Sequence, residues 1–371
     1  MLPTPWHPQL VIGCMSGTSC DGIDAVAVSW AAGRPRAIAA RSLDLGALGN
    51  ELYGITQGQA RPVAQLCALI HELSEAHCRV LAELIAELPQ VPELICVHGQ
   101  TLYHAPPHSW QAINMSLIAE RFALPVVGDL RAADLAQGGQ GAPLSPLGDL
   151  QLYPGSGRRA VINLGGFCNI TILDHDQVAA GYDLCAANHL LNAAARSWLG
   201  LPFDRDGAVA AQGQPDAAAV ADLQQRLAAQ SQGRSLGSGD EALAWVERWR
   251  PQLGPAVALA SIQAALSQVL IRNLQGRGVG QAWLAGGGAL NLSLLSRLRR
   301  AAAAQGISLE SSEAAGLPPM WREGAIMAIL GRRCAQGLPI TLSAVTGCRR
   351  APAVSGIWAW PRPQAGEDGQ P

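Results

Sequence analysis

The chain has 371 residues, of which 49% are hydrophobic and 15% are charged, so it is long enough to bury an ample core in two domains. Its net charge of -2 and pI near 6.4 give no basic field for nucleic acid or anionic lipid. All 26 basic residues are arginine, because the sequence contains no lysine. This excludes a P-loop lysine, a protein-kinase strand lysine, a Schiff-base lysine and an anchor for pyridoxal phosphate. A soluble two-lobed α/β protein is expected.

The amino terminus and the cysteines both favour a cytoplasmic protein. The segment MLPTPWHPQL has no charged region followed by an apolar one, and no run approaches the roughly 18 apolar residues that a membrane span requires. Nine cysteines without a C-x-x-C pair fit reduced thiols better than disulfides or zinc. Cys14 and Cys20 form either a reactive pair or, as favoured here, small apolar filler. Neither a membrane nor a nucleic acid is expected as a partner.

The first predicted element is a β-hairpin over residues 11–28. Its tip, residues 13–18, is rich in glycine and hydroxyl side chains and is followed by Asp21. Backbone amides at such a tip can hold phosphate oxygens without a basic side chain. Most glycine turns between strands are plain hairpin turns, so a single one is weak evidence for phosphate binding.

A helix that leads into a strand is predicted next. Residues 62–88 carry apolar side chains at helical spacing and stop at Pro89. Residues 94–101 follow as a strand that ends in a polar loop, which places His98, Gln100 and Thr101 at its carboxyl end. Open α/β sheets bind ligands at that end, although a turn with solvated side chains is an equally favoured alternative.

Two following segments are interpreted as connections. His104 and His108 flank two prolines, which exclude a shared helical face, so a loop is favoured over a metal-binding pair. Residues 130–146 hold a glycine cluster before a proline and predict a long connection between two halves. The predicted domains are therefore residues 1–130 and 131–371, with a frayed tail at residues 361–371.

The second half repeats the hairpin pattern. Residues 161–173 place Gly165 and Gly166 between two β-prone runs, which indicates an internal duplication of a strand-turn-strand unit. A third glycine turn, residues 286–288, also follows an apolar run. Two phosphate-binding hairpins on related halves are expected to serve one cleft.

The strongest candidate for chemistry lies in residues 181–199. This segment is predicted to begin with a turn at Gly181, to present Asp183 and to continue as an amphipathic helix. A carboxylate just ahead of a helix is either a general base toward an attacking oxygen or a cap of that helix.

In chain order, eight motifs resemble those of the anhydro-N-acetylmuramic acid kinases. They are MSGTSCDGID (15–24), HGQT (98–101), GGQGAP (138–143), NLGGFCNIT (163–171), GYD with a following Asn (181–188), FDRDG (203–207), GGGALN (286–291) and LPPMWREG (317–324). The likeness runs from about residue 11 to about residue 347. The pattern MSGTSxDGxD is far more specific than any glycine turn.

The resemblance implies an α/β fold of the actin/hexokinase/Hsp70 group, with two duplicated ribonuclease H-like domains and an active-site cleft between them. It implies a kinase that uses ATP and magnesium, opens 1,6-anhydro-N-acetylmuramic acid with water and phosphorylates O6. The product is N-acetylmuramic acid 6-phosphate, in peptidoglycan recycling and amino-sugar catabolism. The partner is the small anhydro sugar, and a homodimer is compatible with the resemblance.

The resemblance also assigns roles to individual residues. Asp183 would be the base that activates the water, and Asp21 would bind magnesium. ATP and its phosphates would be held by Gly17, Thr18, Ser19, Cys20, Asp21, Gly22, Ile23, Asp24, Gly165, Gly166, Gly286, Gly287 and Gly288. The sugar would contact His98, Gln100, Thr101, Asn114, Arg131 and Glu323. Phosphoryl transfer needs positioning and charge neutralisation, which amides and a metal supply without lysine.

The sequence departs from the family pattern after the expected base. Cys185, Ala186 and Ala187 stand where relatives have Gly-Pro-Gly before the asparagine. If those glycines have positive φ, Cys185 and Ala187 must either be strained or reshape the loop. Restoring the pattern with Cys185→Gly, Ala186→Pro and Ala187→Gly is predicted to raise activity on the anhydro sugar about tenfold. The alternative functions are a non-catalytic or altered-specificity sugar or nucleotide sensor and, less favoured, a hydrolase of ATP.

Overall fold

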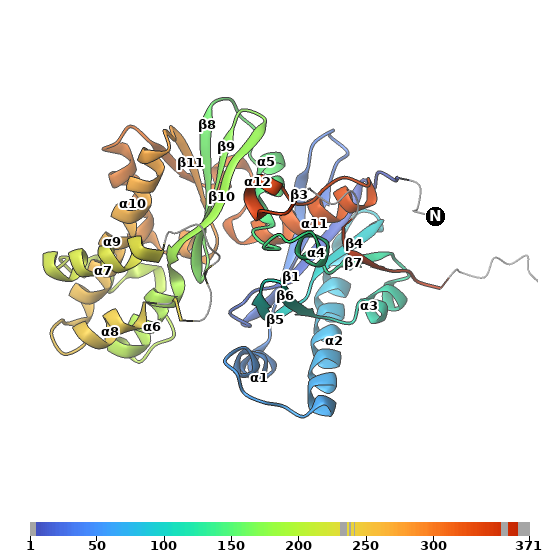
Figure 1. Ribbon diagram of the computed structural model, residues 1–371, viewed down its shortest axis with the longest axis horizontal. Coiled ribbons are helices and arrows are strands. Elements are labelled where there is room, and N and C mark those ends of the chain that lie inside the picture. Colours follow the sequence, from blue (N-terminus) through green and yellow to red (C-terminus); the bar gives the residue numbers. More distant parts are fainter. Residues whose placement is uncertain (1–4, 231–235, 237–238, 241, 350–354, 363–371) are drawn as a thin grey trace, which may run out of the picture. The chain divides into compact units, whose positions relative to one another are not determined.

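The computed structural model of the chain describes residues 5–230, 236, 239–240, 242–349 and 355–362 (Figure 1). Residues 363–371 of the predicted tail lie outside this range. The chain divides into two compact units, the first made of Met1–Gly148 and Glu323–Pro371 and the second of Asp149–Arg322. This division differs from the predicted ranges, because the segment after residue 322 returns to the first unit.

The first unit contains a six-stranded mixed sheet with the strand order β13-β7-β4-β1-β2-β3. Its strands are β1 (Leu10–Ser16), β2 (Gly22–Ser29), β3 (Arg36–Asp44), β4 (Leu94–His98), β7 (Val126–Gly128) and β13 (Ile357–Ala359). The predicted hairpin is confirmed as β1 and β2, which pair antiparallel, whereas β4 lies parallel to β1 and β7 parallel to β4. A separate antiparallel hairpin comprises β5 (Gln100–Ala105) and β6 (His108–Ala112).

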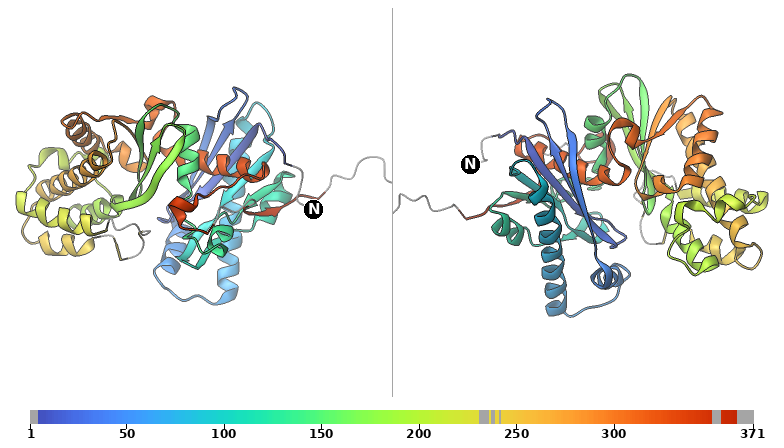
Figure 2. Two further views of the ribbon diagram at one scale, coloured as in Figure 1. Left: turned by 45° about the horizontal axis from the view of Figure 1, so that its top comes forward. Right: turned by 180° about the vertical axis from the view of Figure 1, so that it is seen from behind.

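Two long helices cover opposite faces of this sheet (Figure 2). The predicted helix over residues 62–88 is α2 (Val63–Glu87), and its leucines pack with Ile12 and Ala25 of the sheet. On the other face lies α11 (Arg322–Ala335), because a Cβ on Gly13 would stand only 2.0 Å from the Gly324 carbonyl oxygen. The remaining helices are α1 (Gly46–Thr56), α3 (Met115–Phe122), α4 (Ala132–Ala136), α5 (Ser145–Leu152) and α12 (Ser343–Thr346).

The sheet of the second unit has the order β10-β9-β8-β11-β12. Its strands are β8 (Arg158–Leu164), β9 (Phe167–Asp174), β10 (Gln177–Ala186), β11 (Gln281–Ala285) and β12 (Ser308–Ser311). Three antiparallel strands followed by parallel ones repeat the order β3-β2-β1-β4-β7 of the first sheet. The predicted α/β class is thus confirmed, and the matching strand orders agree with the predicted duplication.

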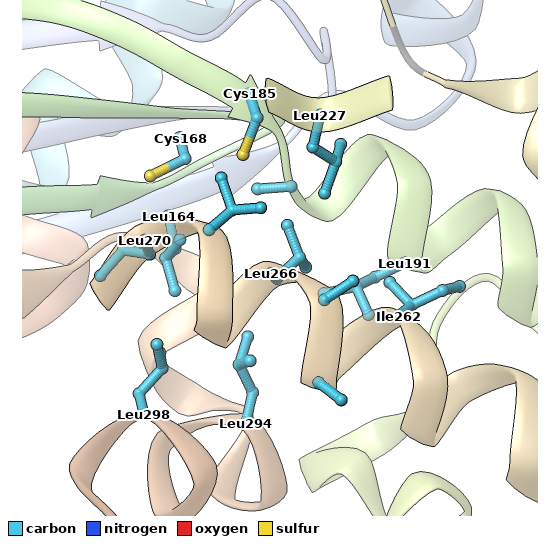
Figure 3. Packing of buried hydrophobic residues seen from close by; sticks show 14 of the residues in the cluster. Leu164, Cys168, Cys185, Leu191, Leu227, Ile262, Leu266, Leu270, Leu294 and Leu298 are labelled. Atoms are coloured by element: carbon cyan, nitrogen blue, oxygen red, sulfur yellow. The ribbon is translucent and has the colours of Figure 1, made fainter. Parts of the chain in front are cut away.

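The second sheet packs on a leucine-rich layer of helices (Figure 3). The helices of this unit are α6 (Asn188–Leu199), α7 (Ala217–Gln230), α8 (Leu243–Trp249), α9 (Pro255–Gly276) and α10 (Leu292–Ala303), with short 3-10 turns η1 (Arg205–Gly207), η2 (Ala210–Gln212), η3 (Gly287–Leu290), η4 (Ser312–Ala315) and η5 (Pro319–Trp321). Among the described residues, α9 alone is long and apolar enough to cross a membrane, which differs from the expectation that no segment is. Because 78% of its apolar window is buried within the structure, its composition is that of a core helix.

Candidate functional site

The turn between β1 and β2 exposes hydroxyl and carboxylate side chains above a closed backbone. The Cys20 N–H donates to the Gly17 carbonyl oxygen at 3.1 Å, and Cys20 adopts a left-handed φ of 57°. Thr18, Ser19 and Asp21 are exposed, and the Ser19 hydroxyl donates to Asp21 at 2.7 Å. The turn therefore presents side-chain oxygens to solvent, while the Cys20 amide is used within the turn.

Helix α1 supports the turn from behind. The Leu45 N–H donates to the Asp21 carbonyl oxygen at 2.9 Å. A Cβ on Gly49 would lie 2.1 Å from the Cys20 carbonyl oxygen, so only glycine permits this approach. The turn is therefore held in place by backbone contacts rather than by its own side chains.

Gly22, Ile23 and Asp24 belong to β2, so the phosphate role expected for Ile23 could involve only its backbone, since its side chain is buried. Burial raises the pKa of Asp24, the Ser42 hydroxyl that donates to it lowers the pKa, and nearby Asp21 raises it again. Asp21 and Asp24 thus form a pair of interacting carboxylates.

The cysteines beside the turn are packing residues. Burial raises the pKa of Cys20 to about 12 and that of Cys14 well above its ordinary value. Both thiols are therefore neutral at physiological pH, which removes the reactive-pair alternative.

The predicted strand over residues 94–101 is two elements. Strand β4 ends at His98, which is buried beside Met15 of β1, and β5 begins at Gln100. The Gln100 amide is fully buried and donates to the Gly17 carbonyl oxygen at 3.0 Å, which ties β5 to the first turn. Thr101 is half-buried. His98 and Gln100 are buried, so the alternative of solvated turn side chains does not apply to them.

The two histidines predicted to lie in a loop lie in facing strands. His104 is in β5 and His108 in β6, and only the two prolines between them form a turn. Strand formation was missed because the prolines hide the short alternating pattern on either side. The described residues contain no group of three or more His, Cys, Asp or Glu side chains that could hold a metal ion.

The other three expected sugar contacts lie in separate parts of the first unit. Asn114 caps α3, where its side chain accepts the Leu117 N–H at 3.2 Å. Arg131 precedes α4, and its guanidinium donates to the Gly141 carbonyl oxygen at 2.7 Å. Glu323 lies in the first turn of α11. The segment predicted as a long connection thus contains α4 and the start of α5.

In the second unit, Gly165 and Gly166 form the two-residue turn between β8 and β9. Their carbonyl oxygens accept the N–H groups of Ala187, Asn188 and His189 at the start of α6, at 3.0–3.1 Å. This turn is docked on the amino terminus of that helix.

The third glycine turn lies beside this one, because β11 runs parallel to β8. Gly286 has a φ of 79°, and a Cβ on Gly288 would lie 2.6 Å from the Leu164 Cβ. Gly287 is open, since its nearest neighbours are at 3.7 Å and beyond. Asn188 completes the group by donating to the Leu164 carbonyl oxygen at 2.9 Å.

Asp183 does not cap a helix. Strand β10 runs through Gly181 and Asp183 to Ala186, and it pairs with β9 along this length. The predicted turn at Gly181 is therefore wrong. Ala187 occupies the cap of α6 and makes no side-chain cap bond. The Asp183 carboxylate instead accepts the Leu236 N–H at 2.8 Å. The capping alternative is therefore excluded.

The departure after Asp183 causes no left-handed strain. Cys185 continues β10, and Ala187 has a φ of -132°. The Cys185 side chain is 1% exposed and points into the leucine layer opposite Cys168, at a small apolar cavity of about 10 Å³ (Figure 3). Cys185 thus anchors the end of the strand in the core.

Comparison with known proteins identifies the family. The sequence profile of the family "Anhydro-N-acetylmuramic acid kinase" matches residues 9–359. An anhydro-N-acetylmuramic acid kinase from Bordetella pertussis is 33% identical over 94% of this chain and 96% of its own length. One from Chromohalobacter salexigens is 36% identical over 94% and 99%. An activator of 2-hydroxyisocaproyl-CoA dehydratase from Clostridium difficile with bound ADPNP covers 88% of this chain and 96% of its own at 13% identity, with a TM-score of 0.47. The chain therefore belongs to the anhydro-N-acetylmuramic acid kinase family.

Proposed function

We propose that this kinase transfers the γ-phosphoryl group of ATP to O6 of 1,6-anhydro-N-acetylmuramic acid, with Asp183 as the base that activates the bridge-opening water. The carrying observation is the Asp183 carboxylate, which is half-buried, held by the Leu236 N–H and not used as a helix cap. A general base must keep a fixed position to take a proton, and the hydrogen bond from the Leu236 N–H holds the carboxylate in place.

The glycine turns supply the phosphate contacts in this proposal. The turn at residues 17–21 presents its amides within the first unit, and Gly165, Gly166 and residues 286–288 gather at one edge of the second sheet. Oriented amides stabilise charge on a transferring phosphoryl group, so lysine is dispensable.

Magnesium fits the first turn. Asp21 and Asp24 are neighbouring carboxylates, and magnesium in kinases is held by one or two carboxylates together with phosphates and water. Asp21 is the exposed member and would be the direct ligand. The bound ion would neutralise phosphate charge, while the turn keeps Asp21 in place.

We infer a cytoplasmic location for the reaction. The nine cysteines are all free, which supports a reducing compartment, because thiols persist unpaired there. The small-molecule partner would be 1,6-anhydro-N-acetylmuramic acid, which derives from the cell wall.

The test is Asp183→Asn, assayed with ATP, magnesium and the anhydro sugar for sugar phosphate and free phosphate. The asparagine can still accept the Leu236 N–H but cannot take a proton, so we expect a loss of about 100- to 10,000-fold in kcat with ATP affinity within a few-fold. Asp176→Asn, on the exposed turn between β9 and β10, is the matched control. A kcat within tenfold of wild type would remove Asp183 as the base. Release of free phosphate alone by the wild type would favour the ATP hydrolase.

A further inference from the structure

Buried polar atoms without partners gather at one edge of the first sheet. The Ser16 hydroxyl and Nε2 of His104 make no hydrogen bond, and the ring nitrogens of His98 and Oε1 of Gln100 have only contacts outside hydrogen-bond geometry, with the Gly99 backbone and the Cys20 thiol. His98 is 6% exposed and Gln100 fully buried. An unpaired buried polar group costs about 1–3 kcal/mol, so such a group indicates a ligand that completes it.

The topology brings these residues together. Ser16 and His98 end the neighbouring parallel strands β1 and β4, and Arg131 follows β7, the next parallel strand. The β5–β6 hairpin adds His104, since Gln100 at its base bonds to Gly17. The carboxyl ends of parallel strands are where α/β sheets bind ligands. His98, His104 and Arg131 are called the histidine cluster below.

The charge of the histidine cluster favours an anion. Burial, and after it the charge of Arg131, lowers the pKa of His98 to about 3 and that of His104 to about 4. The Arg131 guanidinium is therefore close enough to act on both rings. The nearest carboxylate in sequence, Asp129, accepts the Ala132 N–H. The Arg131 cation and the neutral histidine rings, whose N–H groups can donate hydrogen bonds, suit an oxyanion. The two-donor fork of a guanidinium matches the two oxygens of a carboxylate.

The orientation of His104 leaves one ring nitrogen for this ligand. Its Nδ1 is bonded to the Ser109 hydroxyl at 2.9 Å, and the same hydroxyl accepts the Gln111 amide at 2.8 Å. This pair of bonds fixes the ring, so that Nε2 is the atom without a partner.

We propose that His104, together with His98 and Arg131, binds the carboxylate of the acid sugar. This rests on the proposed function, because a muramic acid carries one carboxylate that neutral amino sugars lack. A site built from polar groups rejects an analogue without the matching group, since its own groups are then left unpaired. The cluster would thus set the preference for acid over neutral sugars. A nucleotide phosphate is the other possible oxyanion. The experiment distinguishes the two because it measures KM for ATP separately from KM for the sugar.

The test compares His104→Ala with His108→Ala, its exposed control on the same hairpin. Initial rates are measured with 1,6-anhydro-N-acetylmuramic acid and with its methyl ester. We expect KM for the acid to rise about tenfold in His104→Ala, the equivalent of about 1.4 kcal/mol, with KM for ATP unchanged and KM for the ester changed less than twofold. His104→Gln, which keeps a polar atom near the position of Nε2, should lose less. His108→Ala should match wild type.

Equal losses on acid and ester, or a rise in KM for ATP instead, would overturn the proposal. Calorimetric binding of the acid without ATP gives a second readout at pH 5 in two buffers of different ionisation enthalpy. A bound carboxylate raises the pKa of His104, so wild type should take up protons and His104→Ala fewer. Equal proton uptake by both would also count against the proposal. If wild type binds the acid but forms no sugar phosphate, the kinase function fails while the subsite stands.

Discussion

The buried ion pair between Arg322 and Asp149 offers a sharp test of how the second unit is held together. The Arg322 guanidinium donates to both oxygens of Asp149, at 2.8 and 2.6 Å, and Thr171 donates to the same carboxylate at 2.6 Å. The two side chains are 1% and 0% exposed. Asp149 is the first residue of the second unit and Arg322 is its last. Arg322→Met leaves a buried carboxylate with one hydroxyl donor, and breaking such a pair costs about 3–5 kcal/mol.

Equilibrium urea unfolding measures this cost. The control is Arg299→Met, because the Arg299–Glu310 pair of the same unit is 46% and 49% exposed and should contribute less than about 1 kcal/mol. The double variant Asp149→Leu/Arg322→Met removes both charges and should recover most of the loss. A loss in Arg322→Met as small as that of the control would refute this reasoning. A double variant no more stable than Arg322→Met would do the same.

Three further predictions concern the first unit. Gly17→Ala should keep the free energy of unfolding within about 0.5 kcal/mol, because its Cβ would lie 3.5 Å from the nearest side-chain atom, yet raise the Kd for ATP; unchanged binding would remove the phosphate role. Gly13→Ala should cost about 1–3 kcal/mol in urea unfolding, since its Cβ would meet the backbone of α11, and a neutral result would contradict that packing. Burial lowers the pKa of His98 to about 3 and of His77 to about 4 from the usual 6.5, so the folded state binds fewer protons and stability falls as pH drops from 6.5 toward 4. Thermal melts at pH 7 and pH 5 check this, and His77→Leu should flatten the difference.

Local patterns predicted the elements whose signal lies in their own residues. The two glycine hairpins and α2 follow from alternating strands, small turn residues and helical spacing that ends near Pro89. The motif spacing identified the family, and it placed Gly165 and Gly286 in turns that the structure brings to one sheet edge.

The structure differs from the sequence-based predictions where contacts with distant residues determine the local conformation. Gly181 was expected in a turn, but pairing with β9 keeps it in a strand. The compact units differ from the predicted domain ranges because α11 returns to the first sheet at Gly13, more than 300 residues earlier in the chain. The hydrogen bond from Gln100 to Gly17 likewise joins residues that no local pattern connects. His104 was expected in a loop because two prolines follow it closely, whereas pairing with β6 places it in a strand.

The buried position of Cys185 in β10 supports a different prediction from the gain in activity that was expected from its sequence. The thiol is 1% exposed and fills the leucine layer beside an apolar cavity of about 10 Å³, so Cys185→Gly enlarges this cavity and places glycine in a strand. Together these effects should cost roughly 1–3 kcal/mol of unfolding free energy. Because the strand carries Asp183 two residues earlier, loosening its end should lower kcat rather than raise it.

Urea unfolding and kcat are measured for Cys185→Gly, for the triple variant Cys185→Gly/Ala186→Pro/Ala187→Gly and for Cys67→Ala, an exposed cysteine that serves as the control. A stable triple variant that is about tenfold faster, the equivalent of about 1.4 kcal/mol in the transition state, would show that Cys185 hinders the reaction. Destabilised and slower variants would show that Cys185 anchors the end of β10 in the core. The end of β10, and with it Asp183, then depends on packing in the core for its position.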